Sequence, residues 1–127
     1  MSELLDAIGE QLESQDYTVE EKGEEIFEAR HPERWNFVFT QDVGGVLLRS
    51  SIGTQQTAAD LELYDLINDV HSDSAVLRIY LDEDGDLALE AWWPPIFEEE
   101  AFEMFVQAWN HDISLIAGHD EAAELLE

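Results

Sequence analysis

The sequence of 127 residues contains no cysteine and few cations, with five Lys and Arg against 31 Asp and Glu and a formal net charge of −26. Because there is no cysteine, a disulfide framework, a thiolate nucleophile and a thiolate metal site are excluded, and the chain fits a reducing cytoplasm, where we expect it. The excess of negative charge repels nucleic-acid phosphates and anionic lipid headgroups. We therefore expect neither nucleic acid nor a membrane as its partner.

Long apolar runs and targeting segments are also lacking. The longest run without a polar side chain, residues 91–97, contains Pro94 and Pro95 and is far shorter than the ~20 apolar residues of a membrane span. The first residues lack the basic and apolar regions of a secretory signal. The hydrophobic fraction of 45% and the aromatic fraction of 10% nevertheless exceed those of a disordered acidic tail. Residues 1–127 are therefore expected to fold as a single domain with an apolar core.

Three segments repeat apolar residues at helical spacing. Ser2 is placed to cap the first helix, and Thr57 with Asp60 forms a capping box at the head of the second. The third helix is predicted over Phe97–Ala117, with three glutamates in its first turn and Gly118 as its C-terminal stop. The apolar positions that recur on these helices are Leu4, Leu5, Ile8, Leu12, Leu63, Leu66, Ile67, Val70, Ala101, Phe102, Phe105, Val106, Trp109, Ile113 and Ile116.

Six shorter segments have the composition or the alternation of strands, over residues 17–21, 24–30, 35–40, 46–52, 76–82 and 86–93. The first two are short enough to count as one bent hairpin, so the element order is α-β-β-β-(β)-α-β-β-α. Because Ile26 and Phe27 are adjacent, the pattern leaves open which of them faces the core. This order predicts an α+β domain in which helices flank an antiparallel sheet.

The last two strands can be paired residue by residue. A two-residue loop, Asp84-Gly85, would leave both sides of the hairpin half apolar. A three-residue loop, Glu83-Asp84-Gly85, with a left-handed Gly85 in a G1 bulge, pairs odd positions with odd positions and places Arg78 opposite Glu90. The residues that then share the apolar side are Leu77, Ile79, Leu81, Leu87, Leu89, Ala91 and Trp93. A one-residue slip would turn these residues outward, so burial favours the three-residue loop.

Two segments, LYDLINDV (Leu63–Val70) and LRIYLDEDGDLALE (Leu77–Glu90), are followed by an aromatic-proline link and a Phe-rich helix. Together they resemble the YbjN-like family, bacterial proteins with a proposed role as sensory transduction regulators, similar in fold to type III secretion chaperones. Asp65 stands where the family pattern Asn-x-x-Asn has its first Asn, and Asn68 stands at the second. The resemblance implies a small, non-enzymatic and often dimeric domain that can hold a partner protein, and it transfers no catalytic residue.

The sequence motifs predict no catalytic residue, no cofactor and no metal site. The acidic segment Asp82–Asp86 matches part of an EF-hand loop, but Tyr80 and Ala91 stand where its first and last ligands belong. We interpret this segment as an acidic turn, with weak binding of divalent cations as the alternative. The histidines form no HxH, HxxH or HExxH motif, and they are His31, His71, His111 and His119.

Aromatic residues near the end of the last strand indicate a binding surface. In the predicted register, Trp92 shares a side with Arg78 and Tyr80, opposite the leucines. Either a helix covers this side or it is exposed for a partner. The corner from Trp93 to Phe97 is also bulky and apolar, with simple packing as the alternative to binding. The predicted interface with a partner or a second copy consists of Arg78, Tyr80, Trp92, Trp93 and Phe97.

The acidity has three interpretations that the sequence leaves open. The first is a surface adapted to high salt, as in a halophile. The second is the acidity typical of secretion chaperones, which the resemblance suggests. The third is an imitation of nucleic-acid phosphate that occupies a basic partner. The sequence predicts a non-enzymatic, protein-binding or chaperone-like regulatory domain that forms a homodimer and holds a segment of a partner protein. The alternatives are an acidic protein that binds divalent cations and a phosphate mimic that binds a basic partner.

Overall fold

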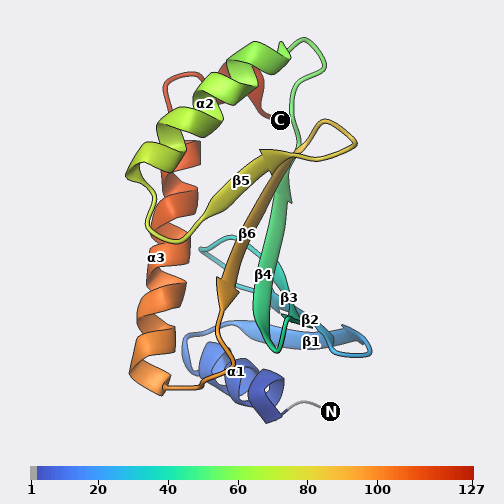
Figure 1. Cartoon of the computed structure of the whole chain (residues 1–127), viewed down its shortest axis with the longest axis vertical. Coiled ribbons are helices and arrows are strands. Elements are labelled where there is room, and N and C mark those ends of the chain that lie inside the picture. Colours follow the sequence, from blue (N-terminus) through green and yellow to red (C-terminus); the bar gives the residue numbers. More distant parts are fainter. Residues whose placement is uncertain (1–2) are drawn as a thin grey trace.

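A computed structural model describes residues 3–127 of the chain (Figure 1), so the expected cap at Ser2 lies outside the described residues. The helices are α1 (Glu3–Ser14), α2 (Asp60–Asp73), α3 (Glu99–Ala117) and α4 (Ala122–Leu125). The strands are β1 (Thr18–Gly23), β2 (Ile26–Arg30), β3 (Phe37–Asp42), β4 (Gly45–Ile52), β5 (Arg78–Leu81) and β6 (Leu87–Trp93). The elements follow the predicted order, and the short helix α4 is added at the C-terminal end.

Within residues 3–127, all six strands form one sheet in the order β1-β2-β3-β4-β6-β5, and every neighbouring pair is antiparallel. The predicted α+β fold, an antiparallel sheet with flanking helices, is confirmed. The hairpin register is confirmed as well, because Leu81 pairs with Leu87 and Arg78 pairs with Glu90. Gly85 has a φ of 85°, the left-handed conformation that the three-residue loop requires.

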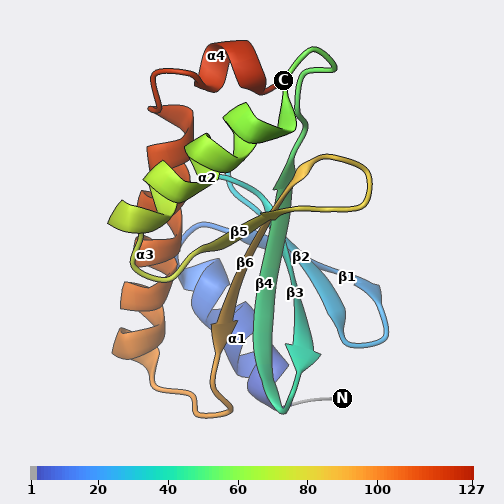
Figure 2. The same ribbon diagram turned by 45° about the horizontal axis from the view of Figure 1, so that its top comes forward.

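The helices pack on one side of this sheet. α3 runs along the sheet, α1 lies near one end, and α2 crosses near the other end (Figures 1 and 2). Every second residue of the strands points to this side, and the apolar residues at helical spacing point back from the helices, so the two layers enclose the core. Fully or almost fully buried members of this single core are Leu5, Ile8, Phe37, Phe39, Leu48, Leu66, Leu87, Leu89, Phe102, Trp109 and Ile113.

The second side of the sheet is not covered by any element within residues 3–127. The pair that the sequence left ambiguous illustrates the division between the two sides. Phe27 turns inward and stacks on Phe39, with ring centroids 5.3 Å apart, whereas Ile26 points outward and is 41% exposed. We call the outward side the open face.

Two helix starts differ from the predictions. α2 begins at Asp60 after Ala59, with no side-chain cap, because the turn that joins Ala58 N–H to the Gln55 carbonyl places Thr57 before the helix. The capping box at Thr57 is therefore wrong. α3 begins at Glu99 rather than at Phe97, because the turn after the two prolines delays it. The carboxylate of Glu98 then accepts the N–H of Ala101 at 2.6 Å and caps the helix.

The C-terminal end of α3 also differs in detail. Gly118 ends the helix as predicted, but with a φ of −89° it is not in the left-handed conformation that a C′ glycine often adopts. The chain continues through a turn at His119 into α4. Leu125 and Leu126 of this last segment are buried, and Leu126 forms an isolated bridge with Thr54. The C-terminal residues therefore complete the core.

A buried carboxylate connects α3 to the start of β5. The Oδ2 atom of Asp112 accepts the backbone N–H groups of Ala75, Val76 and Leu77 at 2.9, 2.7 and 3.0 Å, and the Asp112 side chain is fully buried. Two residues after Leu77, within β5, the N–H of Ile79 donates to Nε2 of His71 on α2 at 2.8 Å. These two side chains hold the strand that carries Arg78 and Tyr80.

We expect Asp112→Ala to lower the free energy of unfolding by about 3 kcal/mol, because three buried backbone N–H groups lose their acceptor. The measurement is urea denaturation followed by circular dichroism. Asp65→Ala on the exposed side of α2 is the control for the loss of one negative charge, and it should change stability by no more than about 0.5 kcal/mol. Equal effects of the two substitutions would show that Asp112 does not anchor β5.

Candidate functional site: the open face of the sheet

The open face collects most of the cations of this acidic chain. Four of the five Lys and Arg residues belong to it, and the fifth, Arg34, lies in the loop before β3. The register of the strands and the ion pairs place the four there; they are Lys22, Arg30, Arg49 and Arg78. Five carboxylates accompany them, namely Glu20, Glu28, Asp42, Asp82 and Glu90. The open face is therefore close to neutral in a chain of charge −26.

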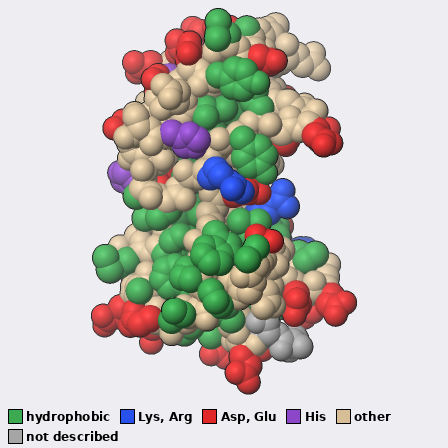
Figure 3. Space-filling view, viewed as in Figure 1, with side chains coloured by type: hydrophobic (Ala, Val, Ile, Leu, Met, Phe, Trp, Pro, Cys, Tyr) green, Lys and Arg blue, Asp and Glu red, His purple; other side chains and the backbone are tan. Residues whose placement is uncertain are grey.

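Figure 3 shows the same distribution on the molecular surface. Lys and Arg side chains group near the centre of the view, where β5 and β6 lie in Figure 1, with hydrophobic side chains above and below them. Most of the Asp and Glu side chains in this view lie around the outline of the molecule. Charge repulsion with an approaching molecule is therefore weakest at the centre of this surface.

Three residues in register across β4, β6 and β5 form the centre of the open face. Arg49 pairs with Glu90, and Glu90 pairs with Arg78, so the three side chains stand side by side. We call them the arginine–glutamate row. Nε of Arg49 lies 3.2 Å from Oε2 of Glu90, and Nη2 of Arg78 donates to Oε1. The hydroxyl of Tyr80 donates to Oε2 at 2.9 Å, and the Arg78 guanidinium lies 5.8 Å from the centre of the Tyr80 ring.

The neighbours of Glu90 change its acidity. Only 5% of this residue is exposed, and burial alone would raise the pKa of the carboxyl group. Hydrogen bonds from Arg78 and Tyr80 and the charges of both arginines outweigh burial, so the pKa of Glu90 lies below its ordinary value. The same hydrogen bond to Glu90, together with burial, raises the pKa of Tyr80 above its ordinary value. Glu90 is therefore an ionised, paired carboxylate at neutral pH.

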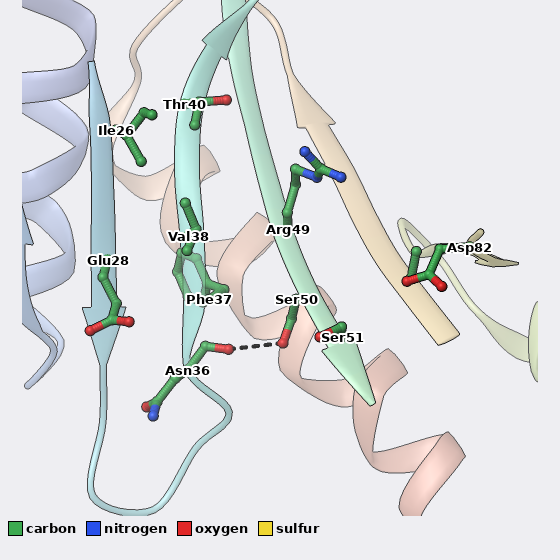
Figure 4. A pocket seen from close by; sticks show the side chains of 11 residues that line it. Ile26, Glu28, Asn36, Phe37, Val38, Thr40, Arg49, Ser50, Ser51 and Asp82 are labelled. Atoms are coloured by element: carbon green, nitrogen blue, oxygen red, sulfur yellow. Dashed lines mark hydrogen bonds between the residues drawn. The ribbon is translucent and has the colours of Figure 1, made fainter. Parts of the chain in front are cut away.

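Two hollows lie on the open face on either side of this row. The first hollow has a volume of about 580 Å³, and Figure 4 shows Val38, Thr40 and Arg49 along it, with the Arg49 guanidinium directed toward β6. Its remaining lining residues include Ile26, Ser51 and Ala88. The second hollow has a volume of about 430 Å³ and is lined by Val43, Leu47, Val76, Arg78, Glu90 and Trp92, among others. Each hollow combines apolar side chains with one arginine and two carboxylates, which are Glu28 and Asp82 in the first and Asp42 and Glu90 in the second.

Trp92 is held in place at the second hollow although it is 44% exposed. Its Nε1 donates to the carbonyl oxygen of Asp42 at 2.9 Å, and its ring lies against Gly45. A Cβ atom at Gly45 would come within 2.7 Å of the indole and 2.2 Å of the Trp93 carbonyl oxygen, so only glycine permits this close approach. The indole is therefore a fixed, exposed anchor.

The turn beside Trp92 contains a strained residue. Val43 and Gly44 connect β3 and β4 with φ angles of 50° and 78°, as a type I′ turn requires. A β-branched residue is unfavourable in the left-handed region, and Val43 is 86% exposed, so burial does not offset this cost. Strained and exposed residues of this kind cluster at functional sites. Val43 lines the second hollow next to Trp92.

The structure separates the five predicted interface residues into two groups. Arg78, Tyr80 and Trp92 come together on the open face, as the register predicted. Trp93 points to the other side, where its ring packs against Phe102 and Phe105, and its Nε1 donates to the Ile96 carbonyl oxygen. Phe97 packs against Phe102 and is 38% exposed. Arg49 and Glu90 complete the site and were not predicted as members, although the Arg78–Glu90 pairing pointed to Glu90.

The acidic hairpin and the histidines have structural contacts. Oδ1 of Asp82 accepts the N–H groups of Asp84 and Asp86, and so the loop folds around its own first residue. His31 accepts the N–H of Glu33, and His119 contacts Asp69. Within residues 3–127, no three His, Asp or Glu side chains are grouped as metal ligands. In the same range, no helix is both long and apolar enough to cross a bilayer.

We expect Glu90→Gln to be less stable than the wild type at pH 7, and the difference to shrink as the pH falls below about 4.5. The pKa of Glu90 is lowered by folding, so its stabilising contribution is complete above the ordinary pKa and is lost as the pH falls through the folded value. Urea denaturation between pH 3 and 7 (roughly the range of carboxyl titration) measures the difference. Glu103→Gln, at an exposed position on α3, corrects for the change in net charge. A difference independent of pH would contradict the pairing of Glu90.

Val43→Asn is expected to raise the free energy of unfolding by about 1 kcal/mol, because asparagine tolerates the left-handed conformation that valine resists. Val43→Ala removes the exposed side chain but keeps a Cβ in the same conformation, so its gain should be smaller. Thermal or urea denaturation of the three proteins gives the comparison. If Val43→Asn gained nothing over Val43→Ala, the turn would not be strained.

Comparisons with known proteins find likeness in the fold. No family model matches the chain, and no curated protein matches its sequence. The crystal structure of YbjN from E. coli, described as a proposed transcription regulator, superposes with a TM-score of 0.76 at 16% identity, covering 97% of this chain and 95% of that chain. A chain of the heterodimeric ExoU–SpcU complex, from the type III secretion system of Pseudomonas aeruginosa, has a TM-score of 0.64 at 18% identity, covering 94% of this chain and 98% of that chain.

Both likenesses extend over almost the whole of each chain, so they concern the complete arrangement of helices and sheet rather than one motif. The identities lie far below the level at which a shared activity would follow, and the agreement is one of architecture. The predicted resemblance is thereby confirmed at the level of fold. The chain has the YbjN-like, type III secretion chaperone-like fold.

Proposed function

We propose that this chain is a non-enzymatic, protein-binding domain of chaperone-like or regulatory kind, which holds a segment of a partner protein on the open face of its sheet. The observation that carries the proposal is the open face itself. It presents a fixed, exposed Trp92, the exposed Tyr80 and the two arginines Arg49 and Arg78, on a sheet side that no described element covers. Tryptophan, tyrosine and arginine are the residue types that most often dominate binding energy at protein interfaces.

The properties of the surrounding surface support the same proposal. Most of the excess negative charge lies away from the open face, so the open face is where contact with another chain costs least repulsion. Among the similar structures, the ExoU–SpcU structure is a heterodimeric complex, and YbjN is described as a regulator. A fold that holds a protein partner in one relative is a reasonable scaffold for the same task here.

Two further parts of the proposal concern assembly and location. We propose a homodimer, because the family that the sequence resembles is often dimeric. We also propose a cytoplasmic location, which the absence of cysteine fits. Light scattering on the purified chain tests the first part, since a monomer at every accessible concentration would contradict it without touching the binding of a partner segment.

We expect Trp92→Ala to reduce the affinity for the partner by at least about tenfold, because an exposed aromatic anchor is removed, while the fold is retained. The partner is obtained by affinity capture with the wild-type domain from its native lysate at native salt, and its affinity is then measured by titration calorimetry. Trp35→Ala removes a similarly exposed tryptophan from the loop before β3 and is the matched control.

Three outcomes of this comparison separate the possible roles of Trp92. Loss of affinity in Trp92→Ala alone, with near-wild-type stability, supports the open face as the binding surface. Equal affinities of all three proteins would place the partner elsewhere and contradict the proposal. Global unfolding of Trp92→Ala would make Trp92 a core residue instead.

A further inference from the structure

The two arginines of the open face share a single carboxylate. Oε1 of Glu90 accepts from Arg78, and Oε2 accepts from Tyr80 and lies 3.2 Å from Arg49, so both oxygens of Glu90 are engaged. A guanidinium has five N–H donors. Apart from their contacts with Glu90, neither guanidinium has a hydrogen bond or ion pair with any residue in the range 3–127. Most of their donors are therefore directed at solvent.

These free donors are accessible. The side chain of Arg49 is 56% exposed and that of Arg78 is 70% exposed, whereas the Glu90 side chain between them is 6% exposed. An approaching molecule therefore meets the two guanidinium groups before it meets the carboxylate. Within the arginine–glutamate row, two cations over one buried anion leave one unit of positive charge. The nearest other carboxylates are those that line the hollows, Glu28 and Asp82 in the first and Asp42 in the second.

The surroundings of the row determine what kind of molecule fits it. The first hollow adjoins Arg49 and contributes Val38 and Ile26, and the second adjoins Arg78 and contributes Leu47 and Trp92. A ligand that matches this surface has apolar side chains for the two hollows and a carboxylate for the arginines between them. Residues i, i+2 and i+4 of an extended chain point to one side, so a short peptide segment can present all three groups.

We propose that the open face recognises an extended, acidic segment of a partner protein, in which one Asp or Glu binds the Arg49 and Arg78 guanidinium groups and flanking apolar residues enter the two hollows. This inference rests on the proposed function and names the chemistry of its partner. Arginine is suited to the task because its planar fork binds both oxygens of a carboxylate. A basic segment would be repelled by the same pair, and a second copy stacked face to face would bring its own arginine–glutamate row against this one.

The long-range repulsion between two acidic chains does not prevent this contact. At about 0.15 M salt, charges separated by more than about 8 Å are largely screened, so the charges on the open face dominate the final approach. The repulsion lowers the rate of encounter more than it weakens the contact once formed. The other two cations of this face, Lys22 and Arg30, already pair with Glu20 and Glu28. A carboxylate of the partner therefore binds most favourably at the central arginines, whose shared partner Glu90 is buried.

The experiment is an array of random short peptides probed with the labelled full-length chain at about 0.15 M salt, the condition at which the rim charges are screened. Four proteins are compared, namely the wild type, Trp92→Ala, the double variant Arg49→Gln with Arg78→Gln, and Arg34→Gln. Arg34→Gln is the matched control, because it also replaces an arginine by glutamine, but at a position outside the open face. A triple variant that adds Glu90→Gln to the double variant removes the whole row and leaves no unpaired buried carboxylate, in case the double variant does not fold.

The expected result has three parts. Peptides bound by the wild type and by Arg34→Gln are enriched in Asp or Glu together with apolar residues. The enrichment in Asp and Glu disappears in the double or triple variant. For one selected peptide, replacing its acidic residue by the corresponding amide weakens binding to the wild type by about tenfold or more, as measured by fluorescence anisotropy, because a charge-assisted pair is lost.

Other results would overturn the inference in distinguishable ways. Peptides that bind in a Trp92-dependent manner without acidic enrichment, or with basic enrichment, would contradict the carboxylate proposal and leave the proposed function standing. Absence of any binding above that of Trp92→Ala would contradict both. Conversion of a dimer to a monomer by the double variant, measured by light scattering, would make this face an interface between copies and would also overturn the inference.

Discussion

The alternation of apolar and polar residues along the strands is the constraint on which the rest of the molecule depends. It gives the sheet one side that can join a core, and the apolar sides of α1, α2 and α3 are all used on that side. The apolar side chains that stay exposed on the helices, Leu61 and Tyr64 of α2 and Met104 of α3, belong to helices that pack on the core side, so none of them covers the opposite side. The open face therefore follows from the same pattern that builds the core, and Trp92, Arg78 and Arg49 are exposed by it.

Two carboxylates then fix the geometry of that face. Among the acidic residues, all of which lie within residues 3–127, only Asp112 and Glu90 are buried. Asp112 attaches the start of β5 to α3, and Glu90 attaches the side chains of β5 to those of β4. A buried charge is tolerated only when it is paired or well hydrogen-bonded, so these two positions specify where β5 lies. The remaining carboxylates are at least partly exposed to solvent.

The element order and the hairpin register could be predicted from the sequence, because buried residues recur at every second position of a strand and every three or four positions of a helix. The hairpin register followed from Leu77 to Trp93, since one slip would have exposed every leucine. The same reasoning placed Trp92 beside Tyr80 but could not tell whether a helix covered them, because coverage depends on how α1 and α3 pack far along the chain. The bulky corner added Trp93 and Phe97 to the predicted interface as a separate argument. Alternation along β6 turns Trp93 to the core side, where it packs against Phe102, and Phe97 packs against the same ring. The capping-box prediction at Thr57 failed because its local motif fits a cap equally well two residues before the actual N-cap, Ala59.

Side chains from the helices also affect whether another strand can pair with the edge strand β5. The N–H groups of Leu77 and Ile79 point away from β6 and donate to Asp112 and His71. These two side chains therefore occupy the places that the carbonyl groups of another chain would take. At the other edge, β1 exposes Glu20, Glu21 and Lys22, charges that oppose pairing with a neighbouring strand. One edge is thus capped and the other charged, so lateral polymerisation of the sheet is hindered at both ends. Although one surface of the sheet is bare, both of its edges therefore resist the edge-to-edge strand pairing from which amyloid-type stacks grow.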